Sequence, residues 1–419
     1  MKIEEAILYC LASQNRGMRT EQIAEMINSK RLHIRKDGQP VTSNQVYAVI
    51  CRYPEPTNEA RAELNLFRIC LARRRKTKSH VCQGGGNDKI DDIKRIRFMK
   101  NKYGEEYKGD SKFVAECRKL QSIYRVEIGE EIRPYTDRYG NVHYYGNYIS
   151  NGENPKEGCW KNFLTKCAYE YAVKRVNNRE KYETIESDRL FNNLLSSQPM
   201  AFNLFCPLRE MPSEIATKVI KAALPDYPIY KVTEIELEFI PENHMELTGD
   251  KSAMDAIIKF KDKDGKDGFV AVETKYSENL GTNTAYVKDE NGKKMPRLQS
   301  INAIRELQCF NPDTENGIIE GKIPLTQIYR NFLLSEIYGF KEEIVSYSII
   351  LAPENHPSTT RELESLTDGL RDEYKNKIKR IHLEDFVNAI IANCPDEYRG
   401  DFERFYDRYL NFDKLKNID

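Results

Sequence analysis

The clearest alternation of apolar and polar positions lies in residues 254–277. The apolar segment MDAIIKF is followed by a charged turn that contains glycine, KDKDGKDG, and by a second apolar segment, FVAVETKYS. Two short apolar segments joined by such a turn are typical of a β-hairpin. Because side chains alternate along a strand, we expect Glu273 and Lys275 on one face, and Val270 and Val272 on the other.

The segments around this hairpin predict a mixed α/β arrangement. Apolar residues recur at helical spacing before it in residues 160–176, 187–205 and 213–225, with Pro199 as a kink or a break in the second segment. Strands are predicted at KVTEIELEFIP before the hairpin and at EEIVSYSIILAP after it, and a helix, LTQIYRNFLLSEIYG, precedes the last strand. A strand that follows a helical crossover usually pairs in parallel, so a mixed central sheet is expected.

Three short helices are predicted at the N-terminus. Apolar residues recur at helical spacing after residue 3 and after Thr20, and Thr42 or Ser43 suits the N-cap of a third helix that Pro54 ends. The exposed face of the third helix carries Asn44, Gln45, Tyr47 and Arg52. Side chains of Asn, Gln and Arg can hydrogen-bond to base edges in the major groove, so these four residues are DNA-binding candidates. The alternative is a helical module that docks on another protein.

These patterns together predict an α+β protein of several domains. A chain of 419 residues has room for two or three domains. We expect a small helical domain in residues 1–57, a basic helical region with a hairpin and linker in 58–150, and an α/β domain with a mixed central sheet in 151–419.

The charge is balanced overall but not locally. The chain has 65 Lys and Arg and 65 Asp and Glu, yet residues 61–112 hold 15 of the basic and 7 of the acidic residues. A basic block of this kind suits contact with phosphates, and its densest run supplies the candidates Arg73, Arg74, Arg75 and Lys76. The alternative is a solvated helical surface.

Several other classes of protein are disfavoured. None of the ten cysteines forms a C-x-x-C pair and no histidine lies at ligand spacing from two of them, so a zinc site is not expected. Free thiols scattered in apolar runs suit a reducing compartment. We find no signal-peptide pattern, no apolar run of membrane-spanning length and no P-loop, and we expect a cytoplasmic protein without a membrane partner.

Asp255, Glu273 and Lys275 resemble the motif of the PD-(D/E)xK nuclease superfamily. That motif places an acid on one strand, and an acid, any residue and a lysine on the next; the two acids here are 18 residues apart. The resemblance covers roughly residues 189–353 and implies a restriction-endonuclease-like core. It also implies Asp255 and Glu273 as ligands of Mg²⁺, for which Mn²⁺ can substitute, with the carbonyl of Thr274 as a third ligand. Asp255, Glu273 and Lys275 are then the expected catalytic residues.

Further residues are expected near this centre. Gln327 matches a glutamine that approaches the active site in RecB-like branches of the superfamily, and Arg330, on the same helix face, can clamp a phosphate. An additional acid is expected from Glu186, Glu238 or Asp250, between which the sequence does not choose. Ser197, Gln198 and Asn203 are either site residues or helix-capping and packing residues.

Residues 1–53 resemble the HARE-type winged helix, although no clear β-wing follows Pro54. The two resemblances together imply a Mg²⁺-dependent endonuclease of double-stranded DNA in a bacterial restriction or phage-defence system. Cutting both strands with one metal centre usually takes two copies, so a homodimer is expected. Two alternatives remain open: a DNA-binding or scaffolding protein whose nuclease fold no longer cuts, and a nuclease directed at RNA.

Overall fold

The computed structural model describes residues 3–12, 20–35, 38–52, 102–137, 139–156, 158–179, 185–280, 286–288, 292 and 294–417. The chain divides into two compact units, Met1–Ile93 and Lys94–Asp419. The three-part division expected from the sequence stays a prediction.

The first unit contains the three predicted helices. They are α1 (Ile3–Ala12), α2 (Thr20–Ser29) and α3 (Ser43–Arg52), and they share a small apolar core. The winged-helix resemblance is not confirmed, because the described residues of this unit form helices and no strand. Thr42 and Gln45 form a reciprocal cap at α3: the Gln45 N–H donates to Thr42 Oγ1, and the Thr42 N–H donates to Gln45 Oε1.

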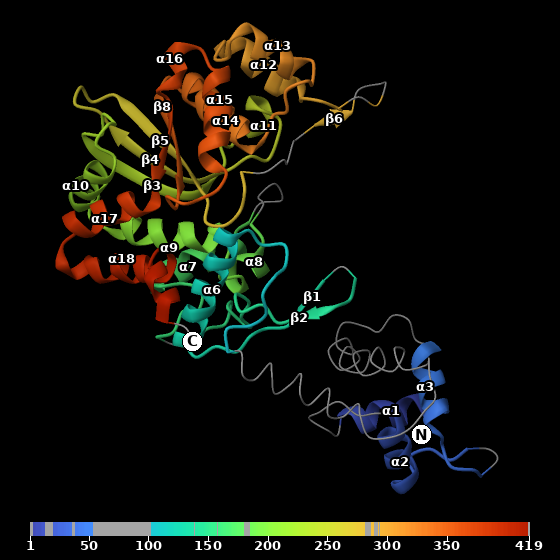
Figure 1. Ribbon diagram of the computed structural model, residues 1–419. Helices are drawn as coiled ribbons and strands as arrows, with labels where there is room; N and C mark the ends of the chain where they lie inside the picture. The colour runs from blue at the N-terminus through green and yellow to red at the C-terminus, as the bar shows by residue number, and fades with distance from the viewer. Residues whose placement is uncertain are drawn as a thin grey trace. The chain divides into compact units, whose positions relative to one another are not determined.

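The second unit is built on a five-stranded mixed sheet (Figure 1). Its strands are β3 (Lys231–Phe239), β4 (Met254–Lys261), β5 (Asp267–Thr274), β8 (Val345–Ala352) and β9 (Ile378–His382), and they lie in that order. The first three strands pair antiparallel, whereas β5, β8 and β9 pair in parallel. The predicted hairpin, the parallel last strand and the mixed α/β class are therefore confirmed, and β9 is a strand that the sequence patterns did not predict.

Helices cover both faces of this sheet. One face packs on α9 (Ser197–Glu210), α10 (Ser213–Ala223) and α17 (Leu383–Asn393), and its buried residues include Val270 and Val272. The other face packs on α12 (Leu298–Leu307), α14 (Gln327–Lys341) and α15 (Thr359–Gly369), and its buried residues include Phe269 and Ala271. The alternation along β5 therefore separates its side chains between two apolar cores, as expected for a buried strand.

A helical layer lies beside the first face. It contains α6 (Lys112–Glu127), α7 (Lys166–Asn177), α8 (Ser187–Asn192) and α18 (Asp396–Tyr409). The remaining elements are short: β1 (Tyr135–Thr136), β2 (Val142–His143), α11 (His244–Leu247), β6 (Val287–Lys288), β7 (Lys294–Met295), α13 (Pro312–Ile319), α16 (Asp372–Lys375) and the 3-10 helix η1 (Phe412–Asn417). None of the described helices combines the length and the apolar character that crossing a bilayer requires.

Two predicted helices differ from those observed. The helix expected from residue 160 begins only at Lys166, because the Thr165 hydroxyl accepts from the Ala168 N–H and caps it there. The second expected helix is two helices, α8 and α9, and Pro199 is not the break. Pro199 lies in the first turn of α9, where its missing N–H costs no helical hydrogen bond.

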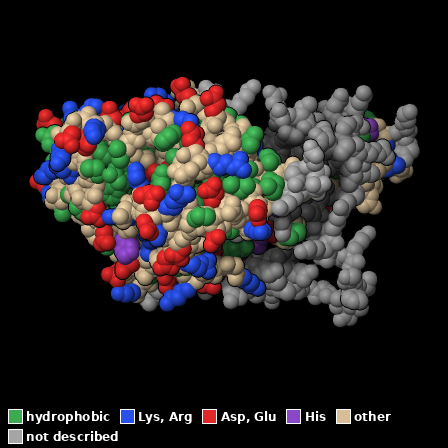
Figure 2. Space-filling view, turned by 90° about the horizontal axis from the view of Figure 1, so that it is seen from above, with side chains coloured by type: hydrophobic (Ala, Val, Ile, Leu, Met, Phe, Trp, Pro, Cys, Tyr) green, Lys and Arg blue, Asp and Glu red, His purple; other side chains and the backbone are tan. Residues whose placement is uncertain are grey.

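Charge is mixed on the face of the molecule that Figure 2 shows, as it is in the composition. In the face seen in Figure 2, acidic and basic side chains alternate over the described part of the molecule, without a broad area of one sign.

Candidate active site

The β4–β5 hairpin brings the two predicted acids to neighbouring positions. Ala256 pairs with Val272, so Asp255 and Glu273 are the next residues toward the carboxyl end of β5. Both lie on the sheet face that packs against α14, and Lys275 follows two residues after Glu273. Antiparallel register therefore produces the juxtaposition that the hairpin pattern predicted.

Asp255 is held by Thr274. Its Oδ2 atom accepts from the Thr274 backbone N–H and from the Thr274 hydroxyl, both at 2.7 Å. Thr274 is fully buried, and its carbonyl stays a proposed metal ligand. Among the described residues none donates to the second oxygen of Asp255, Oδ1, and Asp255 lines a large pocket. One carboxylate oxygen is therefore left to bind something other than the protein.

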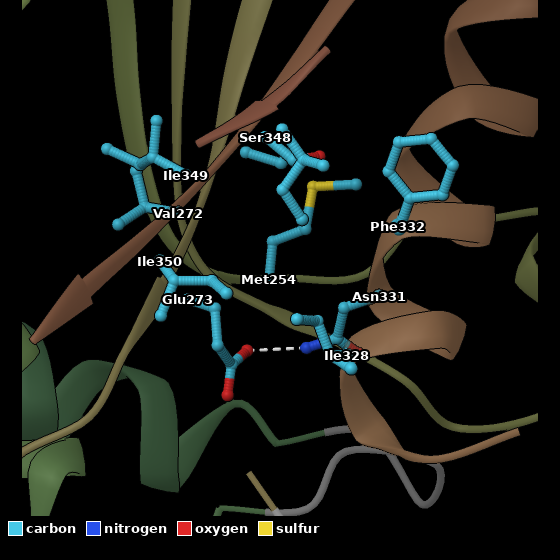
Figure 3. A pocket seen from close by; sticks show the side chains of 11 residues that line it. Met254, Val272, Glu273, Ile328, Asn331, Phe332, Ser348, Ile349 and Ile350 are labelled. Atoms are coloured by element: carbon cyan, nitrogen blue, oxygen red, sulfur yellow. Dashed lines mark hydrogen bonds between the residues drawn. The ribbon is translucent and has the colours of Figure 1, made fainter. Parts of the chain in front are cut away.

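Glu273 does not line that pocket but contacts three side chains that do. Its Oε1 accepts from Gln327 Nε2 at 2.8 Å and lies 2.6 Å from Lys275 Nζ. Its Oε2 accepts from Asn331 Nδ2, the contact drawn in Figure 3. The donors Gln327 and Asn331 are one turn apart on α14, so one helix face holds both oxygens. A cation bound to Glu273 would replace at least one of these donors.

The carboxylates of the site repel one another. Burial and the neighbouring charge of Asp255 raise the pKa of Glu273 to about 7. The same two causes raise the pKa of Glu238 to about 8. Burial acts against the charge of Lys275, but Glu273 and Asp255 outweigh it and raise the Lys275 pKa, so this side chain stays protonated. Positive charge added between Asp255 and the two glutamates would stabilise the cluster.

The pocket beside these residues is large and polar. Its volume is about 650 Å³, within the ~300–1,000 Å³ typical of ligand sites. Its lining includes Asp255, Lys275, Gln327 and Asn331. Glu273 is not among its lining residues and instead borders a separate narrow, apolar pocket (Figure 3).

The three candidate additional acids all line this pocket, but they differ in surroundings. Glu238 is buried on β3, the strand next to Asp255, with a left-handed φ of 53° and one hydrogen bond from Gln198 Nε2 at 2.8 Å. Asp250 accepts from Thr248 and Ser252. Glu186 is exposed. Of the three acids, Glu238 most resembles Asp255 and Glu273 in its surroundings, because it is a buried carboxylate on a neighbouring strand of the same sheet.

The other expected residues divide between site and core. Arg330 lines the pocket, with its Nη1 atom 3.5 Å from Asp250 Oδ2. Ser197 and Gln198 also line it, the former donating to Glu278. Asn203 instead donates to the Asn162 carbonyl and the Tyr409 hydroxyl, inside the core. Asn203 is therefore a packing residue.

Several residues that line the pocket were not predicted from the sequence, and four of them bear directly on its chemistry. They are Arg189, Glu278, Arg297 and Asn331. Asn331 could have been predicted from the sequence, because it follows Gln327 by one helical turn and so lies on the same helix face. Arg189 and Glu278 form an ion pair at 2.6 Å across 89 residues, and no local pattern links positions so far apart.

The DNA-binding candidates of the first unit are described only in part. Asn44 is exposed on α3, while Gln45 is half-buried and its side chain is engaged in the helix cap and by Arg35. The side chains of Tyr47 and Arg52 lie outside the described residues, as do Arg73, Arg74, Arg75 and Lys76. Their proposed contacts with DNA stay predictions.

The donor set fits a hard divalent cation. No group of three or more His, Cys, Asp or Glu side chains suited to a metal ion occurs among the described residues. Mg²⁺ is commonly held by one or two carboxylates, with waters and substrate oxygens completing its shell. Asp255 has one oxygen that accepts no hydrogen bond from a described residue, and Glu273 lies beside it in a cluster with excess negative charge.

Comparison with known proteins agrees with this geometry. No curated protein and no solved structure matches the chain. A family model, the PD-(D/E)XK nuclease superfamily, matches residues 108–411, which is more than half of the chain and includes the whole five-stranded sheet and the pocket. The chain belongs to the PD-(D/E)XK nuclease superfamily.

Proposed function

We propose that this protein is a Mg²⁺-dependent endonuclease that hydrolyses phosphodiester bonds in double-stranded DNA. The observation that carries the proposal is the meeting of Asp255 from β4 with Glu273 and Lys275 from β5 beside a polar pocket. Membership of a nuclease superfamily supports the class of reaction.

Phosphodiester hydrolysis needs an activated water and stabilisation of the negative charge that develops at the phosphate. Bound by Asp255 and Glu273, with the Thr274 carbonyl as a further proposed ligand, a divalent cation would supply positive charge at the phosphate and help to ionise the attacking water. Lys275, protonated and lining the pocket, orients that water and stabilises the developing charge. Gln327 and Asn331 hold the Glu273 carboxylate in place.

The test is cleavage of supercoiled plasmid DNA with Mg²⁺, with Mn²⁺ and with EDTA. The variants Glu273→Ala and Lys275→Ala are each expected to lose activity by roughly 100-fold or more, because each removes a group that acts on the reacting atoms. Lys261→Ala, at the exposed far end of β4, is the matched control and should cut like the parent chain. Full activity in either site variant would refute the assignment.

The same assay separates the alternative functions. A chain that binds DNA but cuts neither DNA nor RNA in Mg²⁺ or Mn²⁺ would be a scaffold with a nuclease fold. Cleavage of RNA in preference to duplex DNA of the same sequence would make it an RNA-directed enzyme.

The proposed setting is a bacterial restriction or phage-defence system, and the proposed active state is a homodimer that cuts both strands. Light scattering during size-exclusion chromatography, with and without duplex DNA, tests the dimer. Helix α3 and the basic block of residues 61–112 are the proposed DNA-binding elements outside the catalytic unit. Because the Gln45 side chain is engaged in the helix cap, Asn44 is the described residue of α3 best available to DNA.

A further inference from the structure

Arg297 lines the active-site pocket, and its side chain has no hydrogen-bond or ion-pair partner among the residues that the structure describes. It directly precedes α12, and its buried Nε atom donates to no acceptor in the described part of the chain. Among the described residues no carboxylate lies within ion-pair distance of it. A buried guanidinium N–H without an acceptor costs free energy, so a native structure that keeps one calls for a ligand or another explanation.

The other two arginines that line the pocket each have an acidic neighbour, although the Nε atom of Arg330, like that of Arg297, is buried without an acceptor among the described residues. Arg189 pairs with Glu278 at 2.6 Å, and Arg330 lies 3.5 Å from Asp250. Arg330 also has Ser252 Oγ at 3.4 Å from its Nη1 atom. Arg297, Arg330 and Ser252 all line the pocket, and we call them its basic part. They offer the pocket guanidinium groups and a hydroxyl, a donor set suited to an anion with several oxygens.

The arginines of the basic part come from different elements than the carboxylates Asp255 and Glu238. Asp255 and Glu238 come from β4 and β3, whereas Arg297 and Arg330 come from the start of α12 and from α14. A pocket of about 650 Å³ has room for more than one phosphate group. The two groups of residues can therefore hold different phosphates of one chain.

We propose that Arg297, supported by Arg330, binds a second phosphate of the nucleic-acid substrate, next to the one that is cut. The inference rests on the proposed nuclease function and adds a substrate contact to it. The ligand chemistry has two sources: an internal phosphodiester of a continuous strand, or the terminal phosphate of a strand end. A contact with an internal phosphate requires only a continuous strand, whereas a terminal contact would tie cleavage to ends.

Binding without cleavage tests the proposal. The full-length chain is titrated in EDTA onto short fluorescein-labelled DNA duplexes, with and without a 5′ phosphate, and anisotropy is followed over a series of salt concentrations. Arg297→Gln should weaken binding about tenfold and lower the slope of log affinity against log salt by roughly one, because one charged phosphate contact is lost. Arg297→Lys keeps the charge and should keep most of the slope.

Arg305→Gln is the matched control. Arg305 is an exposed residue of the same helix, α12, outside the pocket, so its loss changes net charge equally without removing the contact. If Arg297→Gln weakens both duplexes alike, the contact is with an internal phosphate; if it abolishes only a preference for the phosphorylated duplex, the contact is terminal. Either result supports the proposal.

Equal affinity and equal salt slope for Arg297→Gln and Arg305→Gln would overturn it, as would a loss in Arg297→Gln that Arg297→Lys does not restore at all. Thermal unfolding of each variant is measured alongside, so that misfolding is recognised. The catalytic proposal fails independently of this one. If the parent chain does not cut DNA, the catalytic proposal is wrong, whereas the comparison of DNA affinity between Arg297→Gln and Arg305→Gln can still be made and still tests the phosphate contact.

Discussion

Thr274 donates two hydrogen bonds to one oxygen of Asp255, from its backbone N–H and from its hydroxyl, each 2.7 Å long. The middle residue of the E-T-K motif therefore fixes the acid of the preceding strand. These two hydrogen bonds fix the orientation of the Asp255 carboxylate. Its second oxygen, Oδ1, accepts no hydrogen bond from a described residue, and Asp255 lines the pocket. Placement of the candidate metal ligand depends on a residue whose side chain does not itself line the pocket.

Loss of the Thr274 hydroxyl is expected to loosen Asp255. Thr274→Val keeps the shape and the backbone donor but removes one hydrogen bond to a charged group, which is worth roughly 1.5–3 kcal/mol. We expect cleavage to fall by about tenfold or more and to need more Mg²⁺, measured by titrating Mg²⁺ in the plasmid assay. Thr274→Ser should restore most of the activity. An unchanged Mg²⁺ dependence in Thr274→Val would show that the anchor is dispensable.

Asn331 is expected to set the affinity of Glu273 for metal. Groups that hydrogen-bond to metal ligands typically change metal affinity by about 10–100-fold when removed. Asn331→Ala should raise the Mg²⁺ concentration for half-maximal cleavage by roughly tenfold, with little change in the maximal rate. Phe340→Ala, on the exposed side of the same helix, serves as the control. Parallel Mg²⁺ curves for the two variants would exclude this role of Asn331.

Among the three additional acids, Glu238 is expected to matter most. It is buried on the strand beside Asp255, and its left-handed backbone is a conformation that residues other than glycine rarely adopt. Glu238→Gln, which keeps the size of the side chain, should reduce Mg²⁺-dependent cleavage at least tenfold more than Glu186→Gln, a change at an exposed position. The relative initial rates of the two variants decide the matter; a larger loss in Glu186→Gln would reverse the assignment.

Glu336 gives the folded state a pH dependence that is independent of the active site. It is buried on α14, where it accepts from Ser346 Oγ at 2.8 Å, and burial raises its pKa from 4.5 to about 7. The folded chain then binds more protons than the unfolded chain between these two pH values, so this contribution to stability is complete below pH 4.5 and is lost as pH rises through 7.

The corresponding measurement is urea unfolding of Glu336→Gln and of the parent chain. The variant cannot ionise, so its advantage in free energy of unfolding should grow between pH 5 and pH 8, by at most roughly 3 kcal/mol. Glu342→Gln, at the exposed end of α14, should show no such trend. A constant difference between Glu336→Gln and the parent chain across this range would contradict the raised pKa.

Arg408 is expected to be essential for the stability of the second unit. Its fully buried guanidinium donates to Gln121 Oε1 and to two oxygens of Asn162, and lies 4.1 Å from the centre of the Tyr124 ring. Arg408→Ala leaves these acceptors unsatisfied and creates a cavity, at a cost of about 3–5 kcal/mol. Arg404→Ala, on the same helix with an exposed ion pair, should cost less than about 1 kcal/mol. Thermal unfolding measures both; equal midpoints would refute the prediction.

Local patterns in the sequence account for much of the catalytic unit. Alternation in residues 254–277 predicted the hairpin, its two faces and the common side of Glu273 and Lys275. Helical spacing predicted α14 and so placed Gln327 and Arg330 on it. These features depend on the backbone geometry of a few consecutive residues, which is why the linear order of side chains was sufficient.

Only the tertiary structure decided several contacts between side chains of separate elements. The contact of Asn331 with Glu273, the pairing of Arg189 with Glu278 and the entry of Arg297 into the pocket each join separate elements. The parallel addition of β9 also depends on the helices that cover the sheet. Such contacts form only when both apolar faces of the sheet are buried at once, because burial of the whole core, and not the preference of any one segment, sets the distances between elements far apart in the chain.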